Sequence, residues 1–241
     1  MHPRLILFTF LFCWAVLGTL SAQLVPAFYT HERDAGPGHS LARLTARVLF
    51  NAGSAQDNES FLAYGYLSHV DGLSGAAKKE ENASSAVLTF FVEGRVVDLE
   101  QSNTTFMVKS EGSLRVFFAQ QAKRDFSQPD SFRGGEEVAT YNLKRYVFFS
   151  SANDRLQDRS FASIVSSKPF TFRGGAIDLQ RLWGTQLIIE AQAQGRETLP
   201  SPLPEYSAAI AYTGLLFIGG ERAEQTDPLR EAGSVLRLRS G

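Results

Sequence analysis

The stretch Val138–Ser150, VATYNLKRYVFFS, decides the fold class of this chain. Apolar residues recur at every second position, so that Tyr141, Leu143, Val147 and Phe149 share one parity. Successive side chains of a β-strand point to opposite faces, whereas a helix would require a period of 3.6 residues. The stretch therefore predicts a strand with one buried face.

Two charged residues make this prediction specific. Lys144 falls on the polar parity, and we expect its side chain to be exposed. Arg145 falls on the apolar parity, where an unpaired buried guanidinium would be costly. We therefore expect Arg145 to lie at the sheet edge, to extend its head group to solvent or to pair with a carboxylate.

The same alternation extends through most of the chain and is clearest in residues 43–50 and 186–193. About ten such segments, separated by turn signals, predict an all-β fold, an antiparallel β-sandwich or barrel with few helices. We expect strands to end at Gly94 and at the hairpin signal Ser110–Ser113, SEGS. The segment Ala176–Gly184, AIDLQRLWG, fits a short helix and a strand equally well.

The sequence Phe-Arg-Gly-Gly occurs twice, at Phe132–Gly135 and again at Phe172–Gly175. Looser Phe-x-x-Gly matches recur about every 40 residues, a spacing near that of propeller blades. The residues between these matches share little, so recurring turns explain them better than a true repeat. We expect the second glycine of each copy, Gly135 and Gly175, to supply the backbone conformation of a turn.

The chain organisation predicted from composition has three parts. Residues 1–22 combine a basic start, an apolar run and small residues before Gln23, the pattern of a secretory signal peptide. Residues 23–221 form the single β domain, and residues 222–241 are a polar C-terminal tail. The protein should therefore be exported, to the periplasm or the extracellular space, with no membrane span after cleavage of the signal.

Composition excludes several chemistries. The one cysteine, Cys13, lies in the predicted signal peptide, so the mature chain should have neither a disulfide nor a thiolate site. A net charge of −1 argues against nucleic acid as a partner. No dense metal-ligand spacing and no cofactor motif occurs, and we expect neither a metal nor a cofactor.

Candidate binding residues are aromatic. Trp183 with Tyr64 and Tyr66 could form a stacking platform for a ligand such as a glycan. Three sequons are glycosylation sites only if the source is eukaryotic, and their asparagines are Asn58, Asn82 and Asn103.

Three functions fit these patterns. The first is a non-catalytic binding or structural β-domain protein whose partner is an unknown small molecule, glycan or protein. The second is a lipocalin-like carrier of an apolar small molecule, and the third is a secreted hydrolase with a carboxylate pair. The carboxylates available for such a pair are Glu93, Asp98, Glu136, Asp178 and Glu190. A closed barrel with an interior cavity would favour the carrier, and a carboxylate-lined cleft would favour the hydrolase.

Overall fold

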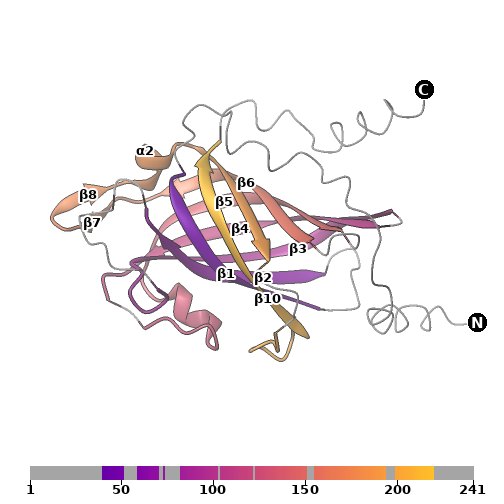
Figure 1. Cartoon of the computed structure of the whole chain (residues 1–241). Coiled ribbons are helices and arrows are strands. Elements are labelled where there is room, and N and C mark those ends of the chain that lie inside the picture. Colours follow the sequence, from indigo (N-terminus) through magenta and orange to yellow (C-terminus); the bar gives the residue numbers. More distant parts are fainter. Residues whose placement is uncertain are drawn as a thin grey trace, which may run out of the picture. The chain divides into compact units, whose positions relative to one another are not determined.

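Eight strands close into an antiparallel barrel, which Figure 1 shows in a computed structural model of the chain. The structure describes residues 40–51, 59–70, 73, 82–102, 104–121, 123–150, 155–193 and 199–219. These residues belong to one of the two compact units of the chain, Gly38–Pro228. The predicted signal peptide, the domain boundary at 221 and the C-terminal tail lie outside the described residues, and they stay predictions.

The order of the barrel strands is β1-β10-β9-β6-β5-β4-β3-β2, and every neighbouring pair is antiparallel. The first and last strands pair with each other and thereby close the sheet. The barrel strands are β1 (Ala42–Phe50), β2 (Ser60–Ser68), β3 (Leu88–Ser102), β4 (Thr105–Phe118), β5 (Glu136–Ser150), β6 (Arg155–Ser167), β9 (Gln186–Ala193) and β10 (Ala208–Ile218).

Four smaller elements complete the described fold. The hairpin of β7 (Phe170–Phe172) and β8 (Gly175–Ile177) and the short helix α2 (Leu179–Trp183) connect β6 to β9, and Figure 1 shows them at one end of the barrel. A 3-10 helix, η4 (Pro129–Arg133), lies between β4 and β5. The all-β prediction is confirmed, and the barrel is the alternative that the chain adopts.

The predicted parity of β5 is confirmed along most of its length. Tyr141, Leu143 and Val147 are buried, whereas Lys144 is exposed. Phe149 is half-buried instead of buried, because it lies near the end of the strand, where its ring contacts that of Phe106 at 6.2 Å between centroids.

The expected breaks at Gly94 and at Ser110–Ser113 are wrong, because β3 and β4 each run through their glycine without interruption. Gly94 and Gly112 are directly opposite each other in the two strands. A Cβ atom at Gly112 would lie 2.3 Å from the carbonyl oxygen of Glu93. The glycines therefore permit a close approach of the two backbones inside long strands.

The two Phe-Arg-Gly-Gly copies adopt different structures. In the first copy, Gly134 ends η4 and Gly135 has φ of 139°, so the prediction for Gly135 is confirmed. In the second copy, Arg173 and Gly174 have φ of 51° and 82° and form the two-residue turn between β7 and β8. The expected turn role of Gly175 is wrong, because Gly175 already pairs with Phe172 in β8.

The segment Ala176–Gly184 contains both of the expected structures, a strand and a short helix. Its first residues complete β8, and Leu179–Trp183 form α2. The Asp178 carboxylate caps this helix by accepting a hydrogen bond from the backbone N–H of Gln180 at 2.9 Å. The helix thereby places Leu179 and Trp183 in the core.

Candidate functional site

The interior of the barrel contains a cavity of about 60 Å³. Its walls come from inward-facing positions of all eight barrel strands, together with Trp183 of α2. The apolar side chains of the lining are Leu44, Ala46, Val48, Phe61, Ala63, Leu67, Phe90, Val92, Leu114, Val116, Leu143, Leu187, Ile189, Ala191 and Leu216, together with the rings of Trp183 and Tyr212. The alternating apolar residues of β1 and β9 thus form part of the cavity wall.

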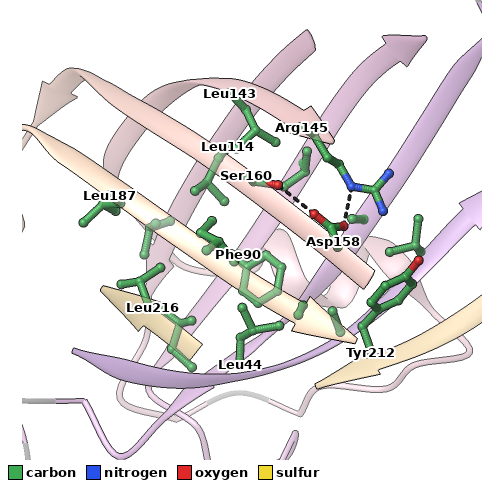
Figure 2. Close-up of a pocket in the computed structure, with 18 of the residues that line it drawn as sticks. Leu44, Phe90, Leu114, Leu143, Arg145, Asp158, Ser160, Leu187, Tyr212 and Leu216 are labelled. Carbon is green, nitrogen blue, oxygen red and sulfur yellow. Dashed lines mark hydrogen bonds and ion pairs between the residues drawn. The ribbon is translucent and has the colours of Figure 1, made fainter. Parts of the chain in front are cut away.

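Four polar side chains gather on one side of this cavity, as Figure 2 shows. Arg145 on β5 donates from Nε to Asp158 on β6 at 2.5 Å, and Ser160 donates to the other carboxylate oxygen at 2.9 Å. The ring of Tyr212 on β10 lies on the same side of the cavity (Figure 2), with its centroid 6.0 Å from Cζ of Arg145. We call these four residues, Arg145, Asp158, Ser160 and Tyr212, the polar cluster.

The charges of the polar cluster are almost withdrawn from water. The side chains of Arg145 and Asp158 are each 9% exposed. Burial by itself lowers the pKa of Arg145, but the negative charge of Asp158 and the Tyr212 hydroxyl outweigh it, so the pKa is raised. For Tyr212 the effect of burial is the opposite: it raises the pKa of the hydroxyl, which therefore stays protonated. The cluster therefore holds one positive and one negative charge, with no net charge.

Aromatic rings cover the guanidinium of Arg145. Its Cζ atom lies 4.8 Å from the ring centroid of Phe61 and 6.0 Å from that of Tyr212. Such contacts stabilise a cation that has lost its water. The expectation that Arg145 pairs with a carboxylate is confirmed, and the partner is Asp158.

A further buried hydroxyl stands beside Arg145. Ser110 on β4 is directly opposite Arg145 in the β4–β5 pairing, and its inward parity matches that of Leu114. Ser110 is 2% exposed, and its Oγ has no hydrogen-bond partner among the described residues. At the α2 end, the indole N–H of Trp183 likewise finds no acceptor within the described part of the chain.

The aromatic residues singled out in the sequence lie on both sides of the barrel wall. Trp183 is buried inside and lines the cavity. Tyr64 is buried on the outer surface of β2, where its hydroxyl donates to the carbonyl oxygen of Phe126 at 2.8 Å. Tyr66, two residues further along β2, is partly buried and contacts the ring of Phe126. The three residues therefore do not form one platform, and a ligand-binding role for each stays a prediction.

Tyr64 belongs to a second apolar cluster, which we call the outer cluster. It lies between the outer face of the strands and the segments that contain η4 and residues 199–206. Its buried members are Leu49, Leu62, Tyr64, Phe91, Phe117, Phe132 and Ala209. The hydroxyl of Thr89 donates to the carbonyl oxygen of Phe132 at 2.7 Å and thereby fixes η4 against β3. The outer cluster has a structural explanation without a ligand.

The carboxylates proposed for a hydrolase have separate neighbours. Glu93 pairs with Arg115 and Arg133, and Asp98 pairs with Lys109. Glu190 pairs with Arg159 at 3.4 Å. Asp178 caps α2, and Glu136 is exposed at the start of β5. None of these five residues lines the cavity, whose carboxylate is Asp158.

Sequence reasoning missed Asp158 because the letters around it, RLQDR (residues 155–159), are mostly polar and show no apolar alternation, although they belong to β6. In the hairpin with β5, Asp158 is paired with Val147, one inward position from Arg145.

Of the three sequon asparagines, Asn82 belongs to the described residues. Asn82 is exposed in a turn, where its side-chain oxygen accepts from the backbone N–H groups of Ser84 and Ser85 at 3.0 and 3.2 Å. Asn58 and Asn103 lie outside the described residues. Glycosylation of all three stays a prediction.

Comparisons with known proteins find no match among family models, curated proteins or solved structures. Within the described ranges, no three His, Cys, Asp or Glu side chains gather as a metal site would require. No helix in the described part of the chain is both long and apolar enough to cross a membrane.

Proposed function

We propose that the protein binds a small, largely apolar molecule inside its barrel, in the manner of a lipocalin-like carrier. The observation that carries the proposal is the interior cavity, whose wall is apolar except for the polar cluster. Ligand pockets commonly combine an apolar wall with a few polar groups that fix the orientation of the ligand.

The size of the cavity sets the scale of the ligand. An engineered apolar cavity of about 150 Å³ in another protein admits benzene. A volume of about 60 Å³ therefore admits a shorter or thinner group unless lining side chains move. A homologous series of alcohols from ethanol to 1-octanol tests which chain length the cavity accepts, because the longer members can bind only where lining side chains move.

Binding can be measured by calorimetry and by the fluorescence of Trp183 in the full chain carrying Trp14→Phe. The protein contains two tryptophans, so this substitution leaves Trp183, in the cavity wall, as the single indole reporter. We expect at least one alcohol to shift the Trp183 emission saturably and to raise the melting temperature, because a ligand that binds the folded state stabilises it.

A variant that fills the cavity tests whether binding takes place inside the barrel. Ala63 on β2 is buried and lines the cavity, so Ala63→Leu should abolish binding. The matched control is Ala211→Leu on β10, because Ala211 is paired with Arg47 and lies on the outward parity next to inward-facing Tyr212. Unchanged alcohol binding in Ala63→Leu, or no binding of any alcohol by the parent protein, would contradict the proposal.

The export predicted from the sequence would place this binding in the periplasm or outside the cell, and it is tested separately. Cleavage near Gln23 is checked by sequencing the N-terminus of the protein from its native host, where an intact Met1 would contradict it.

A further inference from the structure

The polar cluster specifies which apolar molecule the cavity accepts. We infer that the ligand is uncharged and carries one hydrogen-bond acceptor, such as a carbonyl or amide oxygen, that reaches Arg145. This inference rests on the proposed function, and it deepens that function by naming the ligand class.

The charge balance of the polar cluster favours an uncharged ligand. Arg145 and Asp158 neutralise each other inside the barrel, and Tyr212 is uncharged. A ligand carboxylate would place two negative charges beside one guanidinium in a medium of low dielectric constant. A ligand ammonium would meet the guanidinium with the corresponding excess of positive charge. A neutral head group avoids both costs.

The balance of donors and acceptors in the polar cluster favours a ligand that accepts a hydrogen bond. A guanidinium carries five N–H donors. Within the described residues, Nε of Arg145 donates to Asp158. Each oxygen of Asp158 already receives one hydrogen bond, from Arg145 or from Ser160. The cluster therefore offers more donors than acceptors.

Ser110 strengthens this argument. Its buried hydroxyl stands opposite Arg145 and has no partner among the described residues. Leaving a buried polar group without a hydrogen bond is costly. One acceptor oxygen of a ligand, placed beside Arg145, would satisfy donors of the guanidinium and bring an acceptor near Ser110.

The positions of the lining residues would orient such a ligand. The polar cluster lies on one side of the cavity, and Leu187 and Leu216 lie on the other (Figure 2). The head group would therefore approach Arg145, and the apolar chain would extend among the leucines towards the α2 end of the barrel.

The experiment compares three probes of equal length and nearly equal shape, namely hexanamide, hexanoate and hexylamine, with 1-hexanol as the reference. We expect the full-length protein at neutral pH to bind hexanamide about tenfold or more tightly than hexanoate or hexylamine, because only hexanamide is uncharged. Equal or tighter binding of hexanoate, in a protein that binds 1-hexanol, would overturn the inference and leave the proposed function intact. Failure of all four probes and of the alcohol series would overturn both.

A charge variant tests the cause of the preference. Asp158→Asn removes the negative charge of the cluster and leaves Arg145 unpaired, so hexanoate should now bind about tenfold or more tightly than hexanamide. The matched control is Glu190→Gln on β9, which removes the same charge from an outward-facing ion pair with Arg159. A control that reverses the preference would overturn the inference. If Asp158→Asn does not fold, the comparison of probes in the parent protein still decides the question.

Discussion

Arg145 and Asp158 form an ion pair that the barrel holds almost out of contact with water. Ser160, on the same strand as Asp158, donates to its carboxylate, and the ring of Tyr212 on β10 lies 6.0 Å from Cζ of Arg145. At this scale, stability depends on whether each buried polar group keeps its partner, since an orphaned charge costs more than the pair contributes.

The ion pair predicts a specific pattern in a double-mutant cycle. Arg145→Met or Asp158→Leu alone should lower the free energy of unfolding by about 3–5 kcal/mol, because each leaves an uncompensated buried charge. The double variant should cost less than either single change, since no charge remains. Urea denaturation of the four proteins measures this, and additive costs would show that the two residues are not coupled.

Tyr64 predicts a sensitivity to alkaline pH. Its pKa is raised from 10.0 to about 12, chiefly because burial disfavours the phenolate, while the charge of Arg47 acts in the opposite direction. The stability linked to Tyr64 is therefore complete below pH 10 and is lost as the pH rises from 10 to 12.

Replacing Tyr64 by Phe should make the loss of stability above pH 10 shallower. At neutral pH the change should cost about 0.5–1.5 kcal/mol, because the hydrogen bond to Phe126 disappears. Urea midpoints near neutral pH and across the alkaline range check both effects. An identical pH dependence in the two proteins would refute the role of Tyr64.

At the scale of elements, the short segments between strands place apolar side chains inside the barrel and against its outer face. Asp178 starts α2, α2 carries Trp183 into the interior, and Gly184 ends the helix with φ of 80°. The outer cluster similarly depends on η4, which Thr89 holds in place. Single residues in these connections therefore hold larger apolar clusters in place.

Gly135 and Gly175 should differ although they occupy the same position of the repeated motif. Gly135→Ala should destabilise the protein by about 1–3 kcal/mol or more, since φ is 139° and a Cβ atom would lie 2.5 Å from the Phe118 carbonyl oxygen. Gly175→Ala should stay within about 0.5 kcal/mol, because its Cβ would lie 3.7 Å from the nearest atom. Thermal denaturation compares the two, and equal effects would contradict the different local structures.

Asp178→Ala should lower stability by about 1 kcal/mol, because α2 loses its N-terminal cap. If α2 positions Trp183, the Trp183 emission should also move to longer wavelength as the indole gains contact with water. Gln180→Ala is the control, since the Gln180 side chain is exposed on the same helix. An unchanged spectrum in Asp178→Ala would show that the cap does not position the tryptophan.

On the scale of the whole molecule, closure depends on two strands from opposite ends of the described chain. β1 pairs with β10 along the whole of β1, from Ala42 with Leu216 to Phe50 with Ala208. Without this pairing the sheet would have two open edges and no enclosed interior. Closure therefore creates the cavity as well as the fold.

Two positions in β10 test this closure. Leu216 is 3% exposed and lines the cavity, whereas Ile218 is 57% exposed. Leu216→Ala should cost about 2 kcal/mol, the low end of the range for buried leucine, because space already exists beside it. Ile218→Ala should change stability by about 0.5 kcal/mol or less. Equal urea midpoints for the two variants would contradict the closed barrel.

The sequence by itself determined the local features of the barrel. Alternation of apolar and polar residues has the period of a strand, so it predicted the all-β class, the buried face of β5 and the exposure of Lys144. It also predicted that Arg145 needs a carboxylate partner or contact with solvent, because the parity placed this cation on the apolar face. These features depend on neighbours along the chain, which the sequence displays directly.

Only the tertiary structure decided the choice of barrel over sandwich, the partner of Arg145 and the separation of Trp183 from Tyr64. Sandwich and barrel strands share the same alternation, and the difference lies in whether β1 meets β10. The two Phe-Arg-Gly-Gly copies likewise differ through their surroundings, because one ends a 3-10 helix and the other closes a hairpin. Contacts between residues far apart in the chain made these choices, because the local sequence pattern is compatible with either alternative.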